Sequence, residues 1–191
     1  LKQQNPTLDL LELDSVTGAL KIKNNINYED NHMISLVVEA SDLCPTLGCR
    51  KRTTLSVWLA IEDENDNSPV FNSYTPFDVR ENEAVGYKIV YVVANDIDSG
   101  ANGQISYSIV SGNNEGKFDI DTQSGLLSIS SALDREEKSL YILNLMARDQ
   151  GLTPRSSFTS LTINVIDVND NRPKFDKSKY QGQITENNNG G

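Results

Sequence analysis

Short stretches in which apolar and polar residues alternate run along most of this chain. Their apolar positions are rich in Val, Ile and Leu, and clusters of Gly, Asn, Asp and Pro separate one stretch from the next. Alternation of this kind places successive side chains on opposite faces of a β-strand. Only residues 131–138 have a pattern that would permit a helical turn. The pattern predicts an all-β sandwich with one core per domain and with strands at residues 34–40, 55–61, 89–94, 105–110, 141–147 and 159–166.

Several short motifs occur twice, which indicates tandem domains. The acidic pentapeptide 63–67 returns 104 residues later as 167–171, and each copy follows an apolar strand pattern. The other repeated motifs are separated by 107 residues rather than 104, so the first copy has three extra residues between Asp42 and Asp63. The repeat predicts two domains of about 100 residues each. The other paired motifs, all separated by 107 residues, are 14–20 with 121–127, 28–29 with 135–136, and 40–42 with 147–149.

The chain is acidic, with a formal net charge of −10 and a pI of about 4.5. This charge argues against nucleic acid or anionic lipid as the main partner and favours cations or basic surfaces. The apolar runs are far shorter than a membrane span, and no charged segment followed by an apolar one opens the chain. We therefore expect an internal piece of a larger extracellular protein, without nucleic-acid binding and without direct membrane contact.

The two acidic pentapeptides are the strongest chemical signal in the sequence. Asp and Asn offer the oxygen ligands that Ca²⁺ prefers, and their density at a repeat boundary predicts a calcium site in a joint between tandem domains. The simpler interpretation is a set of solvated turn residues, because Asp and Asn are common in loops. The same order of acids in both copies favours the metal site, since turn chemistry does not require that order.

The second copy also carries several spaced motifs in a fixed order, at residues 79–83, 95–103, 118–121, 133–136 and 147–151. With these motifs, the chain resembles the extracellular repeats of the cadherin superfamily. The resemblance implies an all-β fold of tandem seven-stranded Greek-key β-sandwiches of the immunoglobulin-like, cadherin type. It divides the chain into residues 1–68, the C-terminal part of a repeat truncated at its N-terminus, residues 69–172, a complete repeat, and residues 173–191, the first strand of a third repeat.

The first copy has no counterpart of residues 69–107, which would supply its opening strands and its basal glutamate. The remaining strands would expose their core and an unpaired edge, so we expect residues 1–68 not to fold as an independent domain. At the other end, residues 180–186 resemble the opening strand of a third repeat, with Glu186 as its basal glutamate.

The resemblance also implies about three Ca²⁺ ions at each complete joint. Asn27 stands where the second copy has Asp134, so we expect the outermost ion of the first joint to bind most weakly. The implied ligands of the first joint are Asn27, Glu29, Asp63, Glu64, Asn65, Asp66, Asn67, Asp96, Asp98, Asn102 and Asp149, of which Glu64, Asn67 and Asn102 use backbone carbonyls. Those of the second joint, which is only partly present, are Glu81, Asp134, Glu136, Asp167, Val168 and Asp170.

Both cysteines, Cys44 and Cys49, lie in the insertion of the first copy. An even number of cysteines at short spacing in an extracellular protein favours a disulfide. A zinc site would have only two soft ligands here, and a redox pair usually has two intervening residues rather than four. The disulfide is interpreted either as a simple staple or as the stiffening of a recognition loop.

Trp58 is the only tryptophan. Alternation along residues 55–61 places Leu55, Val57, Leu59 and Ile61 inward, and therefore Trp58 outward. An outward Trp either anchors a partner surface or covers a neighbouring strand of its own domain.

Enzymatic chemistry has little support, because the single histidine, His32, lies in a polar turn without a nucleophile motif around it. The favoured function is calcium-dependent cell–cell adhesion, in which Ca²⁺-stiffened repeats bind a cadherin on an apposed cell, homophilically or heterophilically. The implied location is the extracellular region of a plasma-membrane protein at a cell junction. The alternatives are a mechanical spacer that binds no partner and a calcium-dependent receptor segment for a soluble ligand.

Overall fold

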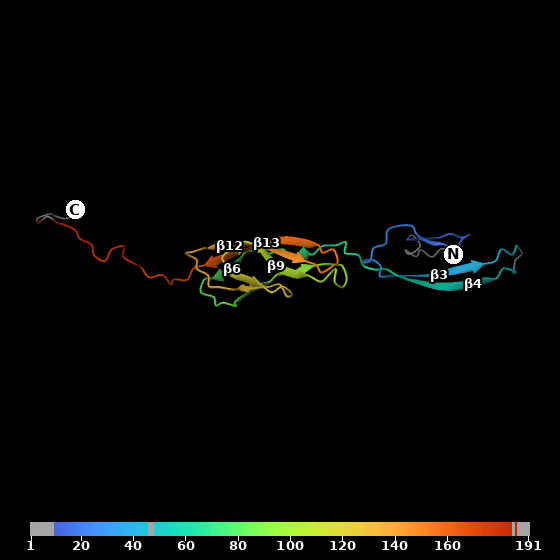
Figure 1. The fold of residues 1–191 in the computed structure, drawn as a ribbon, viewed down its shortest axis with the longest axis horizontal. Helices are drawn as coiled ribbons and strands as arrows, with labels where there is room; N and C mark the ends of the chain where they lie inside the picture. Colours follow the sequence, from blue (N-terminus) through green and yellow to red (C-terminus); the bar gives the residue numbers. More distant parts are fainter. Residues whose placement is uncertain (1–9, 46–47, 185, 187–191) are drawn as a thin grey trace.

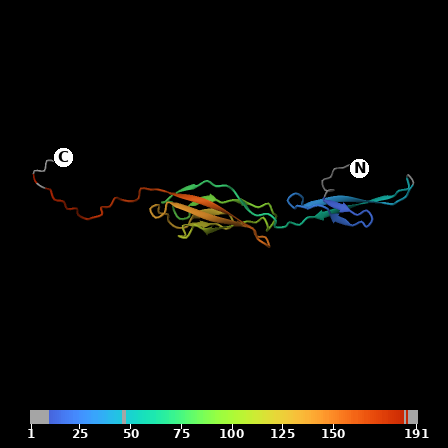
Figure 2. The ribbon, with the colours of Figure 1, turned by 90° about the horizontal axis from the view of Figure 1, so that it is seen from above.

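The computed structural model describes residues 10–45, 48–184 and 186, and these residues form thirteen β-strands and no helix. Two strand-rich units lie end to end, joined by an extended linker, and the C-terminal segment runs away from the second unit (Figure 1). The view from above shows the same order of the two units (Figure 2). The described part of the chain accordingly contains no apolar helix of membrane-spanning length.

The second unit consists of two β-sheets that enclose one core. The unit contains nine strands, and seven result when β5 (Val70–Phe71) with β6 (Phe77–Arg80) and β7 (Lys88–Tyr91) with β8 (Ala94–Asn95) are each counted as one interrupted strand. The strand predicted at residues 89–94 is therefore interrupted after Tyr91. The four-stranded sheet has the order β6 (Phe77–Arg80), β13 (Ser156–Ile166), β12 (Leu140–Arg148) and β9 (Ser106–Ser111). The three-stranded sheet has the order β10 (Phe118–Ile120), β11 (Leu126–Ile129) and β7 (Lys88–Tyr91), while β5 (Val70–Phe71) pairs with β8 (Ala94–Asn95).

Alternating side chains of the central strands form the core of the second unit. Tyr141, Leu143 and Leu145 of β12 are at most 1% exposed, and Leu161 and Ile163 of the adjacent β13 are fully buried. The residues between them face outward, so the alternation visible in the sequence is kept in the structure. Burial of one such side chain contributes roughly 1.5–3 kcal/mol to folding.

The described part of the first unit contains two hairpins, β1 (Leu11–Leu13) with β2 (Leu20–Ile22) and β3 (Met33–Ser41) with β4 (Arg52–Ala60). A shift of 107 residues places β1 on β10 and β3 on β12, and a shift of 104 places β4 within β13. Because every strand of these hairpins has a counterpart in the second unit, the two units are copies of one arrangement.

The first unit has a much smaller core than the second. Ile34 is the one fully buried hydrophobic residue among residues 10–45 and 48–60. The prediction that Leu55 lies on the inward face of its strand is confirmed, but that face does not bury it. Leu55 lies on the same face of the hairpin as Leu59, but it is 66% exposed because no described strand covers that end of β4.

Both units use the same tight turn between equivalent strands. Asp14 and Asp121 each accept hydrogen bonds from the backbone N–H groups two and three residues later. Each turn ends at a glycine with positive φ, +72° at Gly18 and +68° at Gly125. A side chain at Gly125 would also collide with the backbone oxygen of Val92, so only glycine fits there.

Outside the strands, two segments bear on the predictions. Residues 131–138 form a single turn, closed by a 2.9 Å hydrogen bond from the Lys138 N–H to the Asp134 carbonyl. Residues 180–184 form no strand with any described residue, and Tyr180 and Ile184 are 58% and 97% exposed. Thr185 lies outside the described residues, and the assignment of residues 173–191 to a third repeat stays a prediction.

The core predicts the outcome of one pair of substitutions on β12. Leu143→Ala removes a fully buried side chain and is expected to lower the free energy of unfolding by about 2–5 kcal/mol. Ile142→Ala, the matched control, changes a side chain that is 51% exposed and is expected to cost less than about 1 kcal/mol. Urea unfolding followed by tyrosine fluorescence measures both; equal losses would contradict the assignment of the two faces.

Candidate metal centre

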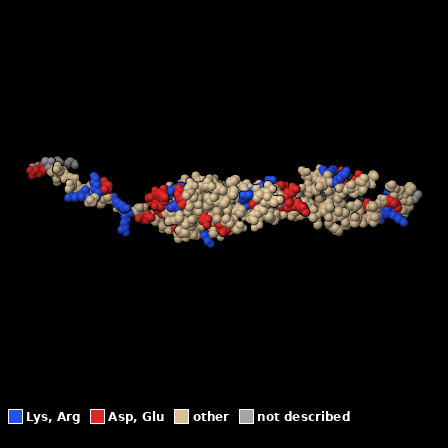
Figure 3. Space-filling view, in the orientation of Figure 1, with Lys and Arg blue, Asp and Glu red and all other residues tan. Residues whose placement is uncertain are grey.

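Four segments bring acidic and amide side chains together where the two units meet. They are the turn before β3, which carries Glu29, the linker at residues 61–69, the loop after β8, which carries Asp96 and Asp98, and the residue after β12, Asp149. The acidic atoms appear as a red group at this junction in Figure 3. The cluster is therefore assembled from both units.

Three carboxylates converge at the centre of the joint. Glu29, Asp63 and Asp98 each offer an oxygen that lies within 4.8 Å of the other two. Asp98 is 7% exposed and the neighbouring Asp149 only 2% exposed, which is rare for acids without a counter-ion. At such a separation, two like charges repel by roughly 1–4 kcal/mol, depending on the local dielectric. The arrangement therefore favours a positive charge between them.

The pKa of Asp96 is shifted in the direction expected for a partly buried acid beside other acids. It is raised above the usual value of 3.8, first by burial, which outweighs a hydrogen bond from the backbone N–H of Asp98, and further by the charges of Asp98 and Asp149. A cation nearby would lower this pKa, because opposite charge favours the ionised form.

Several buried oxygens at the joint have no hydrogen-bond donor from the protein. They are Glu29 Oε1, Asp63 Oδ1, Asn65 Oδ1 and Asp96 Oδ2. Buried polar atoms are normally paired, and an unpaired carboxylate oxygen is costly. These atoms are all oxygens from the residue types that Ca²⁺ prefers, so the residues present fit a hard divalent cation.

Two linker asparagines attach the linker to the second unit. Asn65 Nδ2 donates to Asp149 Oδ1 at 3.1 Å and to the Thr153 carbonyl at 3.0 Å. Asn67 binds the carboxylate of Asp98 twice, through its backbone N–H at 3.1 Å and through Nδ2 at 2.6 Å. Both asparagines therefore act as hydrogen-bond donors to acids of the second unit.

The start of the linker is attached in the same way. Asp63 Oδ2 accepts hydrogen bonds from the Ser99 N–H at 3.1 Å and from Asn102 Nδ2 at 2.8 Å. Gly151 lies against this contact: a Cβ there would collide with Asn65 Nδ2 and lie 2.7 Å from Asn102 Oδ1. The absence of a side chain at Gly151 lets the linker approach the loop after β12.

On the side of the first unit, the joint contains a hollow of about 210 Å³. Asn27 lines it, with Nδ2 at 3.5 Å from Asp30 Oδ2. All residues predicted for the first joint therefore lie at this junction, and their role as ligands stays a prediction. The lining residues are Ile26, Asn27, Tyr28, Glu29, Ile61, Glu62, Glu64 and Asp66.

A second acidic cluster lies at the far end of the second unit. Glu81, Asp134 and Glu136 offer oxygens within 4.8 Å of one another, and Glu81 is only 5% exposed. In contrast to Glu29 of the first cluster, Glu81 is fully hydrogen-bonded. Its two oxygens accept hydrogen bonds from the backbone N–H groups of Arg135 and Val168, at 2.7 Å each. Of the other predicted residues, Asp170 accepts a bond from the Asn171 side chain at 2.8 Å.

Arg135 supplies a positive charge inside the second cluster. Its Nε lies 2.8 Å from Asp167 Oδ1, and its Nη2 lies 3.1 Å from Glu136 Oε1. The hydrogen bond that Arg135 donates to Asp167 is the main cause that raises the pKa of Arg135. The first cluster has Tyr28 at the corresponding position, with its ring 4.4 Å from that of His32, and no ion pair of the described residues reaches Glu29. The sequence analysis included Arg135 in a motif but did not predict its ion pairs with Asp167 and Glu136.

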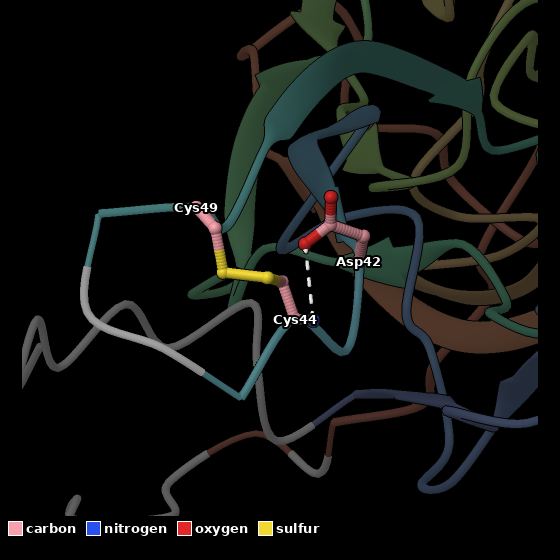
Figure 4. Close-up of a disulfide and its surroundings, with 3 residues drawn as sticks. All are labelled: Asp42, Cys44 and Cys49. Atoms are coloured by element: carbon pink, nitrogen blue, oxygen red, sulfur yellow. Dashed lines mark hydrogen bonds between the residues drawn. A yellow bond between two sulfur atoms is a disulfide. The ribbon is translucent and has the colours of Figure 1, made fainter.

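The disulfide prediction is confirmed, since Cys44 and Cys49 are bonded with their Cα atoms 5.9 Å apart (Figure 4). Beside the bridge, the backbone N–H of Cys44 donates to Asp42 Oδ1 at 3.3 Å. The equivalent Asp149 accepts the N–H of Gly151 at 2.9 Å. The bridge therefore closes the insertion directly after a turn that both units share.

Trp58 lies on the outer face of the β3–β4 hairpin, as alternation predicts, and is 65% exposed. Ser35 lies directly opposite it, with Met33 and Val37 at the diagonal positions. Met33 and Val37 are 60% and 67% exposed, so the three apolar side chains form an exposed patch. Its use as a partner contact stays a prediction.

Fold and joint together define a protein of tandem β-sandwiches connected by a linker rich in acids and amides. Residues 75–166 match the family model described as the cadherin domain. The chain belongs to the cadherin superfamily, as the motifs of its second repeat predicted.

Named relatives agree with this membership. The chain is 37% identical over 187 residues to Protocadherin-16 of Rattus norvegicus, covering 98% of this chain and 6% of that protein. It is 41% identical over 176 residues to Protocadherin Fat 4 of Homo sapiens, covering 92% of this chain and 4% of that protein. The crystal structure of mouse cadherin-23 EC22-24 is similar with a TM-score of 0.80 and 37% identity, covering 88% of this chain and 54% of that one.

The chain thus spans only a few per cent of the length of the curated relatives it matches. It consists of cadherin repeats like those of protocadherins and cadherins, none of which is named as an enzyme.

Proposed function

We propose that this chain is a calcium-stiffened segment of a cell-adhesion protein. In this proposal the repeats lie in the extracellular region of a plasma-membrane protein at a cell junction. They hold a recognition surface against a cadherin on an apposed cell, either a second copy of the same protein or a different cadherin. Membership of the cadherin superfamily and the construction of the joint support this function.

The single observation that carries the proposal is the convergence of carboxylates without a counter-ion at the joint. Glu29 comes from the first repeat, Asp63 from the linker and Asp98 from the second repeat, and their oxygens lie within 4.8 Å of one another. When bound, a divalent cation supplies the positive charge that turns this repulsion into attraction. Because the acids belong to both repeats, the same charge would fix the repeats relative to each other.

The donor set favours calcium over other metals. The cluster contains oxygen donors and neither His nor Cys, which suits Ca²⁺ better than zinc. We assign about three ions to the joint, because Glu29, Asp63, Asp66, Asp96, Asp98 and Asp149 together carry six negative charges. The assigned ligands are these six, with the side chains of Asn27 and Asn65 and the backbone carbonyls of Glu64, Asn67 and Asn102.

We assign a weaker, partial site to the second cluster. Arg135 already neutralises Asp167 and Glu136 there, and backbone N–H groups occupy both oxygens of Glu81. The assigned ligands are Glu81, Asp134, Glu136, Asp167, the Val168 carbonyl and Asp170. We place the repeat boundaries at residues 68/69 and 172/173, with residues 173–191 as the start of a third repeat.

The second candidate function is a mechanical spacer that sets reach and stiffness without binding a partner. The end-to-end arrangement of the two repeats favours it, because such an arrangement transmits length whether or not a contact surface is present (Figure 1). Both candidates require the calcium joint, and they differ in whether the chain associates with a cadherin.

Calorimetric titration with Ca²⁺ tests the ligand assignment. Asp66 and Asp98 are each assigned to two ions, so Asp66→Ala or Asp98→Ala is expected to weaken more than one binding step, by about tenfold, which corresponds to the loss of one close charge pair. Asn27→Asp adds a charge only to the outermost ion and, when the first repeat is extended to include its basal glutamate, is expected to raise affinity at that step alone.

The matched control for this series is Asp119→Ala, which removes an exposed carboxylate on β10, outside both clusters. It should leave the titration unchanged. If Asp66→Ala binds Ca²⁺ as tightly as the parent protein, the placement of the ions is wrong.

Analytical ultracentrifugation separates adhesion from the spacer. If the outer face of β3–β4 is a homophilic contact, the chain forms a dimer in Ca²⁺ that is lost in chelator. Trp58→Ala then weakens the dimer by about 2 kcal/mol or more while thermal stability stays nearly unchanged, because this side chain is 65% exposed. A monomer at high concentration in Ca²⁺ argues for the spacer or for a different partner.

A further inference from the structure

The linker is attached to its two neighbouring repeats by different kinds of interaction. On the side of the second repeat, hydrogen bonds join protein groups directly. Asn67 holds Asp98 through two bonds of 3.1 and 2.6 Å, and Asp63 is held by Ser99 and Asn102 at 3.1 and 2.8 Å.

On the side of the first repeat, the linker makes one backbone hydrogen bond, and its other close polar neighbours carry the same charge. The Ile61 N–H donates to the His32 carbonyl at 3.1 Å, and beyond Ile61 the described residues show no hydrogen bond between residues 62–67 and the first repeat. The polar approaches to the first repeat are those of its Glu29 to Asp63 and Asp98, all carboxylates, and the 210 Å³ hollow lies beside Glu29. Asp63 also lies close to Asp98 of the second repeat, but there the hydrogen bonds described above hold both carboxylates.

We propose that Asn67 and Asn102 form a clasp that holds the linker on the second repeat without a cation, so that the joint bends at Glu62 when calcium is removed. Ile61 is hydrogen-bonded to the first repeat, and Asp63 is hydrogen-bonded to the second. Glu62 is the one residue between them. The inference rests on the proposed calcium joint and adds where that joint is flexible.

The side-chain amide explains why asparagine, rather than aspartate, suits positions 67 and 102. Its NH₂ donates to a carboxylate, whereas an aspartate at the same place would add a further like charge to the cluster. Asn67 and Asn102 are assigned to calcium only through their backbone carbonyls. Their side chains can therefore be removed without removing an assigned ligand, and this makes the clasp separable from the calcium site.

Pulsed electron-spin distance measurements on the whole chain test where the joint bends. A spin label at the exposed Glu64 is paired with one at Val37 of the first repeat, 67% exposed, or with one at Ile97 of the second repeat, 66% exposed. On chelation, the Glu64–Val37 distance distribution is expected to broaden and the Glu64–Ile97 distribution to keep its width. Equal broadening of both pairs would overturn the proposal.

Hydrogen exchange tests the clasp itself, at the backbone N–H groups of Asn67 and Ser99, which donate to Asp98 and Asp63. In the parent protein both are expected to stay protected in chelator. With Asn67→Ala or Asn102→Ala they are expected to exchange about tenfold faster in chelator, as for the loss of one hydrogen bond to a charged group.

The matched control is Asn72→Ala, which removes an exposed asparagine side chain outside the joint and is expected to leave exchange unchanged. Unaltered exchange in the Asn67 and Asn102 variants would overturn the clasp. Failure of Ca²⁺ to change the Glu64–Val37 distribution, with no heat of binding, would instead refute the proposed calcium joint. The two failures are therefore distinguishable.

Discussion

Mutual repulsion among the carboxylates at the joint is the constraint on which the rest of the structure depends. Strand ends fix where these acids stand: Glu29 precedes β3, Asp98 follows β8 and Asp149 follows β12. At least in the second repeat, these strands belong to a packed core and cannot move to relieve the repulsion. Relief requires either a cation or a change in the angle between the repeats, so the charge state of the joint and the shape of the protein are linked.

The two acidic clusters answer the same constraint in different ways. The first has Tyr28 beside its glutamate and leaves several buried oxygens without donors, whereas the second has Arg135 paired with Asp167 and Glu136. Exposed ion pairs of this kind are worth little individually, yet they place a positive charge where the first cluster has none. In the proposed joints, one residue in an otherwise repeated motif would therefore change how strongly a joint depends on metal. In the first joint, the proposed clasp of Asn67 and Asn102 would make this dependence one-sided.

The sequence predicted the longer strands and the repeat well, because strand alternation and tight-turn chemistry are local. The short strands β1, β2, β5, β6, β10 and β11 lie outside the predicted ranges, because two to four residues are too few to show alternation. The offsets of 107 and 104 residues map β3 onto β12 and β4 into β13, and the disulfide followed from two cysteines in one short insertion. The exposure of Leu55 could not be predicted, since it depends on what lies opposite a strand rather than on the strand itself. The contacts of Asn67, Asn102 and Arg135 were missed for the same reason: each joins residues that lie more than thirty positions apart in at least one of its bonds.

The central claim is that calcium fixes the angle between the repeats. Small-angle X-ray scattering of the whole chain, recorded in Ca²⁺ and in chelator under otherwise equal conditions, tests it most directly. The account predicts an extended pair-distance distribution in Ca²⁺, in agreement with the end-to-end arrangement of the repeats, and a broader distribution with fewer long distances in chelator (Figure 1). Superimposable profiles in the two solutions would contradict it.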